Sequence, residues 1–188
     1  AKNWQFRTLF DGEKMLSRAR SVGFVPTMQC PEPTLAHRWE DLNTLGFPEG
    51  TLRNWDNLED VEIFIRPTHQ WLVNYLLLEK VDEQNGIATT SIPGTYRLCK
   101  VKNKDWDETC WVENVLGALD EPGEWVLNSK TGKLYYWPES GKPGDNISAP
   151  VVRELVLVEG RNVDAVEGDM PVRGIIFDGL IFTGGDRD

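Results

Sequence analysis

The side chains in this sequence that are best suited to binding a ligand are aromatic. An exposed Trp or Tyr offers an apolar face that stacks on a sugar ring, while polar neighbours hydrogen-bond the hydroxyl groups. His69 lies two positions before Trp71, so the two share a face of any strand that includes them. The alternative role for such residues is packing in the core of a small β-domain. The residues that we predict to contact carbohydrate are Trp55, His69, Trp71, Trp106 and Tyr136.

The sequence predicts no catalytic residue. It contains two histidines, and neither sits in a Ser/His/Asp or zinc-binding pattern. Glycosidases need two carboxyl groups about 5–9 Å apart across a sugar cleft, but 30 acidic residues make neighbouring pairs unavoidable. We therefore interpret the acidic pairs as solvated loop residues that aid solubility. These pairs are Glu59 with Asp60, Asp105 with Asp107, Glu121 with Glu124, and Asp186 with Asp188.

The sequence predicts no metal site and no cofactor. Clustered oxygens at residues 105–108 could hold calcium, but their spacing matches no known calcium loop. The sequence contains no glycine-rich nucleotide loop and no nucleophile elbow. Arg18 and Arg20 share a strand face and could meet an acidic sugar, although a structural salt bridge is the favoured interpretation.

The composition is that of a folded chain whose partners are neither nucleic acids nor membranes. Its 188 residues carry a net charge of −10, whereas nucleic acids and anionic membranes attract a basic surface. No run of 18 apolar residues is present to span a membrane. An apolar fraction of 40% suffices for the core of one domain, or of one domain and part of another.

Three cysteines leave at least one outside any intramolecular disulfide: Cys30, Cys99 and Cys110. Cys99 and Cys110 could bridge the ends of the loop over residues 100–109, but spacing alone does not decide this. We predict buried thiols, with this bridge as the alternative.

Short apolar runs separated by Gly and Pro predict an all-β fold, with a small β-sandwich or barrel over residues 1–145. The clearest hairpin joins residues 124–127 to 133–137 through a turn at 128–132. Apolar residues at helical spacing predict two short helices, over 35–45 and 111–119. Further strands are predicted over 4–10, 14–19, 61–65, 71–81, 87–92 and 96–101.

Two apolar runs near the end of the sequence resemble each other. Residues 155–160 and 174–182 align with an offset of 19, and each run contains an acidic residue followed by Gly, at 159–160 and 178–179. Recurrence at about 20 residues suggests successive coils of a solenoid. The alternative is two ordinary strands of one β-domain. Because a coil buries its apolar face only against neighbouring coils, about three are needed for stability.

Residues 111–125 and 132–138 resemble a segment of large secreted bacterial proteins with a right-handed parallel β-helix, which act on carbohydrates and include glycoside hydrolases. Residues 149–150, 155–160 and 171–182 extend the resemblance, and residues 9–14 and 18–20 are similar to the family's opening pattern. In such proteins a small β-domain is inserted near the start of the β-helix. The resemblance therefore implies a β-sandwich or barrel-like inserted domain over 1–148. The first, incomplete coils of a right-handed parallel β-helix would follow over 149–188.

The family's catalytic carboxylates would lie on later coils, so none is carried over to this sequence. The resemblance implies a secreted (extracellular or periplasmic), non-catalytic accessory fragment of a larger polysaccharide-degrading enzyme, shaping or flanking its carbohydrate cleft. Its partner would be a polysaccharide or oligosaccharide. The alternatives are an independent carbohydrate-binding module and a structural or interaction domain of a surface protein. Because the coils would be incomplete, we expect residues 151–188 to self-associate or to pack on the inserted domain.

Overall fold

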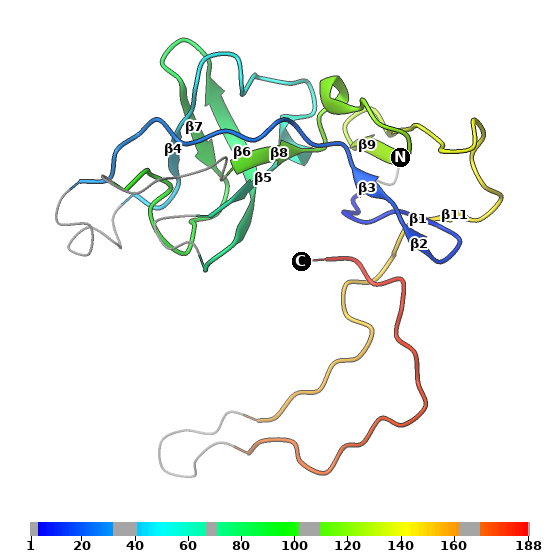
Figure 1. Ribbon diagram of the computed structural model, residues 1–188. Helices are drawn as coiled ribbons and strands as arrows, with labels where there is room; N and C mark the ends of the chain where they lie inside the picture. Colours follow the sequence, from blue (N-terminus) through cyan, green and yellow to red (C-terminus); the bar gives the residue numbers. More distant parts are fainter. Residues whose placement is uncertain (1–3, 32–40, 67–70, 102–109, 162–169, 188) are drawn as a thin grey trace. The chain divides into compact units, whose positions relative to one another are not determined.

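The computed structural model describes residues 4–31, 41–66, 71–101, 110–161 and 170–187. Within these ranges the chain is all-β, which confirms the predicted class, and its strands form three open sheets (Figure 1). Helical turns in the same ranges are two short 3₁₀ segments, η1 (Leu58–Asp60) and η2 (Leu116–Ala118). Neither of them has the length and hydropathy that a helix needs to cross a membrane.

The largest sheet has five antiparallel strands in the order β4-β7-β6-β5-β8. Its longest strand, β6, alternates in burial, because successive side chains of a strand point to opposite faces: Leu76 and Leu78 are buried while Tyr75 and Glu79 are exposed. The strand bounds are β4 (Thr44–Gly46), β5 (Glu62–Ile65), β6 (Asn74–Asp82), β7 (Ile87–Thr90) and β8 (Cys110–Glu113).

One apolar core packs against this sheet. It combines inward side chains of the strands with residues from the connecting segments, and Trp55, Leu58 and Val81 pack at its margin. Its buried members are Phe24, Leu45, Phe47, Leu52, Val61, Ile63, Ile65, Leu76, Leu78, Ala88, Leu98, Cys110, Val112, Val115 and Ala118.

The second sheet has the order β10-β9-β3 and contains the predicted hairpin. β9 (Glu124–Asn128) and β10 (Lys133–Tyr136) pair antiparallel, and in the turn between them Asn128 Oδ1 accepts the Thr131 N–H at 2.9 Å. On the other side of β9, β3 (Ser17–Arg18) pairs parallel with Glu124 and Trp125. Trp125 is fully buried.

The third sheet is small and has the order β11-β1-β2. β1 (Phe10–Asp11) pairs antiparallel with both β2 (Lys14–Met15) and β11 (Ile147–Ser148). The sheet belongs to the second of two compact units into which the chain divides. Unit 1 comprises Ala1–Trp4 and Ser17–Pro143, and unit 2 comprises Gln5–Leu16 and Gly144–Asp188. The predicted division after residue 148 stays a prediction.

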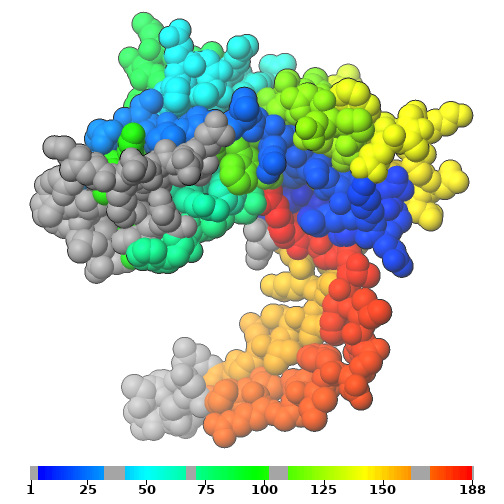
Figure 2. Space-filling view, viewed as in Figure 1, coloured from blue at the N-terminus to red at the C-terminus, as the bar shows by residue number. Residues whose placement is uncertain are grey.

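The described residues after β11 are extended and contain no stacked coils of a parallel β-helix. The two similar apolar runs lie on the outgoing and returning sides of one open loop, joined by an antiparallel bridge between Arg161 and Met170 (Figure 1). The space-filling view shows the two sides of this loop, coloured orange to red, as a slender part of the chain (Figure 2). Nothing in this part of the described chain pairs the two runs with each other in parallel.

Both predicted helices are wrong where the structure describes them. Residues 111–113 belong to strand β8, because β5 lies beside them and pairs Phe64 with Trp111 and Ile65 with Cys110. The turn that follows β8 is the 3₁₀ segment η2. The end of the other predicted helix is strand β4, paired with β7, while residues 35–40 lie outside the described ranges. The predicted strand over 96–101 is reduced to isolated bridges at Leu98 and Lys100.

The prediction of three buried thiols is wrong, and so is the alternative bridge between Cys99 and Cys110. Cys30 and Cys99 form the disulfide, with their Cα atoms 5.1 Å apart and 69 residues between them in sequence. Backbone hydrogen bonds hold the two segments together: Cys30 N–H donates to Lys100 O, and Lys100 N–H donates to Met28 O. Cys110 is buried in the core.

Candidate functional site

A cleft of about 330 Å³ opens on unit 1 where three separate segments of the chain meet. The segments come from the stretch after β3, from the turn before η1, and from the residues around η2. The lining residues are Arg20, Ser21, Val22, Arg53, Trp55, Val115, Gly117, Ala118 and Asp120.

The first wall of the cleft is anchored to the edge strand β8. Ser21 donates its N–H to Val112 O at 2.9 Å, and its Oγ accepts the Val112 N–H at 3.1 Å. Arg20 forms an antiparallel bridge with Glu113. These contacts hold Arg20 in position although its side chain is exposed.

The second wall is a tight turn that carries Arg53 and Trp55. The Trp55 N–H donates to Arg53 O at 3.0 Å, and Trp55 O accepts the Leu58 N–H at 3.1 Å. A side chain from the loop after β6 also holds the turn, because Glu83 Oε1 accepts the Asn54 N–H at 2.9 Å. Trp55 is half-buried against the core, and Arg53 is exposed.

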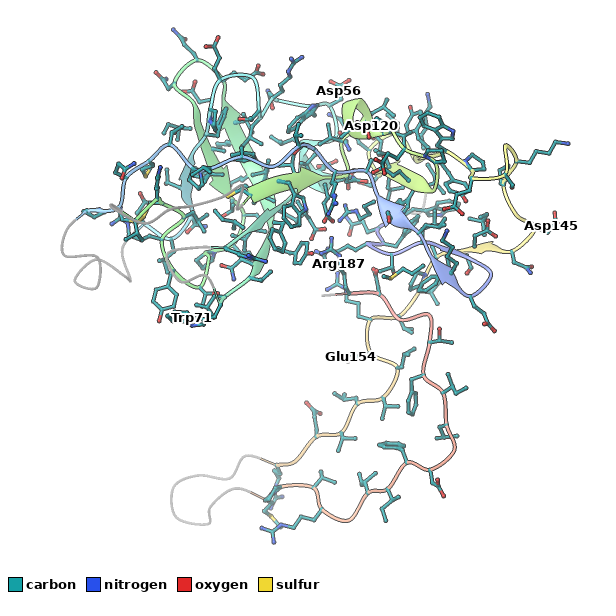
Figure 3. All side chains as sticks on the ribbon, viewed as in Figure 1. Asp56, Trp71, Asp120, Asp145, Glu154 and Arg187 are labelled. Carbon is teal, nitrogen blue, oxygen red and sulfur yellow. A yellow bond between two sulfur atoms is a disulfide. The ribbon has the colours of Figure 1, made fainter. Side chains whose placement is uncertain are left out.

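The third wall is held by a buried carboxylate. Glu124 is 8% exposed, and its Oε2 accepts the N–H groups of Asp120 at 3.1 Å and Glu121 at 3.2 Å. Glu124 therefore organises the turn that follows η2. The exposed Asp120 side chain, labelled in Figure 3, lines the cleft.

Two arginines, Arg20 and Arg53, contribute positive charge to the cleft. The Arg20 guanidinium lies over the Trp111 ring, 5.5 Å from its centroid, in a cation–π contact. Among the described residues, neither Arg20 nor Arg53 forms an ion pair. The cleft thus combines an aromatic surface, two guanidinium groups and one carboxylate.

The structure separates the predicted sugar-binding residues. Trp55 lines the cleft, Trp71 is 77% exposed, and Tyr136 is half-buried on β10. Neither Trp71 nor Tyr136 lines the cleft, and Figure 3 shows Trp71 and Asp120 on opposite sides of unit 1. His69 and Trp106 lie outside the described residues.

The two arginines considered together in the sequence have different environments. Arg18 forms an ion pair with Glu62, lies 3.9 Å from Glu113, and donates to Asp60 O at 3.2 Å. The side chains of Arg18 and Glu62 are 7% and 4% exposed. The favoured interpretation, a structural salt bridge, is confirmed for Arg18, whereas Arg20 lines the cleft.

Several of the acidic residues predicted to be solvated are bound to the fold instead. Asp60 accepts hydrogen bonds from Ser129 Oγ at 2.6 Å and from Ser129 N–H at 2.7 Å. Glu124 organises the turn after η2, and Asp186 accepts the Arg7 N–H and the Thr8 hydroxyl. The solvated interpretation is wrong for these three residues. No group of metal-binding side chains gathers in the described ranges, and residues 105–108 lie outside them.

Sequence reasoning missed Arg53 and Asp120 as cleft residues. The sequence did contain a signal for Arg53: it stands two positions before Trp55, a spacing that places both residues on one short turn. Asp120 offered none, because Glu124 and the path of η2 bring it to the cleft.

Comparison with known proteins supports the fold. A solved structure described as "Glycoside hydrolase" matches 82% of this chain with a TM-score of 0.55 and 21% sequence identity. The match covers 28% of that chain, so the present chain corresponds to just over a quarter of its length. No protein-family model matches the sequence, and no curated protein matches it. The likeness is one of fold to part of a glycoside hydrolase.

Proposed function

We propose that this chain is a non-catalytic accessory portion of a larger, secreted polysaccharide-degrading enzyme with a parallel β-helix, in which it shapes or flanks the carbohydrate cleft. The observation that carries the proposal is the match of most of this chain to part of a glycoside hydrolase.

The proposal of a β-helix is supported by how unit 2 closes on itself. The Asp186 N–H donates to Val152 O at 3.2 Å, so the returning side of the loop reaches the start of the outgoing side. The Asp186 carboxylate accepts the Arg7 N–H at 2.9 and 3.1 Å, and Oδ1 accepts the Thr8 hydroxyl at 3.0 Å. Together with residues 7–8, residues 152–161 and 170–186 outline one open ring.

On the returning side of this ring, exposure alternates between neighbouring apolar side chains, as it does in a solenoid coil. Phe177 is 52% exposed and lies edge-to-face with Phe182 at 5.6 Å, whereas the intervening Ile181 is 90% exposed. Phe177 and Phe182 line a hollow of about 460 Å³ together with Leu155 and Val156. A single coil leaves such side chains half covered, because only coils above and below would complete their burial.

The corners of the ring also fit a coil of short strands. Positive φ angles occur at Gly174, Gly179 and Gly184, a conformation that costs glycine little and other residues more. Gly160 is constrained differently, because a Cβ there would lie 2.7 Å from Met170 O.

Secretion is supported by the disulfide. Disulfides persist in oxidising compartments and are rare in the cytosol. The Cys30–Cys99 bond closes a separation of 69 residues in unit 1 and is therefore suited to an extracellular or periplasmic protein.

A second candidate function is an independent carbohydrate-binding module, and the cleft beside Trp55 is the observation that favours it. Such a module predicts saturable sugar binding by this chain alone. A structural domain of a surface protein, the third alternative, predicts neither sugar binding nor activity.

The deciding experiment compares three proteins on a panel of polysaccharides: this chain, a longer natural chain that contains it, and the longer chain without residues 17–143. We expect new reducing ends from the longer chain, none from this chain, and a changed substrate range or rate after the deletion. Because the deletion can disturb folding, the longer chain with only Arg53→Gln and Trp55→Ala serves as a milder variant. An inactive longer chain, or cleavage by this chain alone, overturns the proposal.

A further inference from the structure

We propose that the cleft beside Trp55 binds an acidic sugar, namely a uronic acid residue whose carboxylate pairs with the guanidinium groups of Arg20 and Arg53. The inference rests on the proposed carbohydrate role and names the class of sugar. It follows from the charges, the aromatic surface and the size of the cleft.

The cleft has more positive than negative side chains, whereas the chain as a whole is negatively charged. Acidic residues outnumber basic ones by 30 to 20, and elsewhere in unit 1 Arg18 pairs with Glu62 and Arg97 lies 3.9 Å from Asp41. Arg20 and Arg53 form no such ion pair with any described residue, although both line the same cleft. An acidic ligand would supply the counter-charge that neighbouring acids supply to the other two arginines.

The chemistry of guanidinium favours a carboxylate as this counter-charge. The planar group presents parallel N–H donors that match the two oxygens of a carboxylate. The Trp111 ring lies against the Arg20 guanidinium and helps to hold it. Stacking uses the face of the group and leaves its N–H edge available to a ligand.

The remaining lining residues suit the ring and hydroxyl groups of the same sugar. Trp55 is fixed by its packing on the core, and the part of its ring that lines the cleft offers an apolar surface. Asp120 is an acceptor for a sugar hydroxyl in the cleft. The volume of about 330 Å³ lies near the lower end of the range for small-molecule sites, about 300–1,000 Å³, which suits one sugar residue.

The experiment measures binding of three oligosaccharides to this chain by NMR, with the Trp55 indole N–H as the reporter. The probes are trigalacturonate, the uncharged α-1,4-linked galactotriose, and a sulfated galactose oligosaccharide. We expect a saturable shift with trigalacturonate, at an affinity at least about tenfold above that of the neutral trisaccharide, and a fall in affinity as salt is raised. Equal affinity for the neutral sugar, or no saturable shift at Trp55, overturns the inference. Tighter binding of the sulfated sugar overturns the assignment of the anion as a carboxylate.

Matched variants locate the site. Arg53→Gln removes an exposed charge at the cleft, and we expect it to weaken trigalacturonate binding about tenfold and binding of the neutral sugar much less. Arg66→Gln removes an exposed charge beyond the end of β5, outside the cleft, and is expected to change little. Equal losses in the two variants indicate non-specific attraction and overturn the inference. Loss of binding in Trp71→Ala, with Arg53→Gln unchanged, overturns it as well.

Failure of this inference is distinguishable from failure of the proposed function. A longer chain that degrades a neutral polysaccharide, with no uronate binding at Trp55, overturns only the acidic sugar. A longer chain that is inactive on every polysaccharide overturns the accessory role, whatever the cleft binds.

Discussion

The side-chain amide of Asn114 pairs with both backbone groups of Leu127. Its Oδ1 accepts the Leu127 N–H at 2.7 Å, and its Nδ2 donates to Leu127 O at 2.7 Å and to Asp60 O at 3.0 Å. β3 pairs with β9 only as far as Trp125, so the amide of Asn114 takes the place of a neighbouring strand at Leu127. Asn114 is fully buried and has a φ of 70°, a conformation that Asn tolerates better than most residues.

We expect Asn114→Ala to lower the free energy of unfolding by about 3 kcal/mol, at about 1 kcal/mol for each lost hydrogen bond. Asn114→Gly is the control, because it removes the same bonds but accepts a positive φ. It should therefore lose slightly less stability than the alanine variant. Urea unfolding measures both, and a loss well below about 1 kcal/mol in both variants would show that the amide contributes little.

The buried ion pair of Arg18 and Glu62 should respond strongly to the loss of one partner. Glu62→Gln is expected to destabilise the fold by about 3 kcal/mol or more, because it leaves the Arg18 charge in a buried setting. Replacing both residues, as Arg18→Met with Glu62→Leu, should cost less than the two single substitutions added together. A double-mutant cycle by urea unfolding tests this, and strict additivity contradicts it.

The disulfide is expected to stabilise the folded chain by about 2–4 kcal/mol, because it restricts the unfolded chain. The unfolding midpoint should fall when a reducing agent is added, and fall similarly in the double variant Cys30→Ala with Cys99→Ala. That variant should be insensitive to the reducing agent, since Cys110 takes no part in the bond. A midpoint unaffected by reduction refutes this prediction.

The turn after β6 should show a pH dependence through Asp82. Two hydrogen bonds from Asn85, first that of its side chain at 2.7 Å and then that of its backbone at 3.0 Å, hold the pKa of Asp82 below its ordinary value of 3.8. Because the folded-state pKa is the lower one, the stabilisation is present above the ordinary value and is lost as the pH falls through the folded pKa.

An NMR titration of the Asp82 carboxyl carbon measures this shift. Asn85→Ala should raise the pKa towards 3.8, because it removes the larger contribution. Gln84→Ala should leave it low, since Gln84 acts only through its backbone. An equal effect of both substitutions is inconsistent with this account.

The open ring of unit 2 should promote self-association. Its half-exposed apolar side chains, among them Val156 and Phe177, would be covered by a second copy of the chain. Phe177→Asp is expected to shift the chain towards monomer in sedimentation equilibrium. Met15→Asp, at an exposed apolar residue on β2, is the control and should have little effect. A wild-type chain that is monomeric at all concentrations contradicts the expectation.

The elements that sequence predicted well depend on residues close together in the chain. The hairpin of β9 and β10 was predicted because its turn residues and its strands lie within about a dozen positions, a local pattern. The helix over 111–119 was predicted wrongly, because Val112 and Val115 at helical spacing both reach the core from β8 and the turn after it. Periodicity does not distinguish these two arrangements over so short a run.

The sequence by itself determined the all-β class, the main hairpin, Trp55 as a candidate and the resemblance to carbohydrate-active proteins. Turn residues, the alternation of apolar and polar residues, and local motifs extend over only a few positions, so they can be recognised without the tertiary structure. Only the tertiary structure decided that Cys30 bonds to Cys99 and that Arg20, Arg53 and Asp120 share one cleft with Trp55. These groups are separated by tens of residues in the chain, and their proximity depends on how β3, β8 and the segments around η1 and η2 pack together.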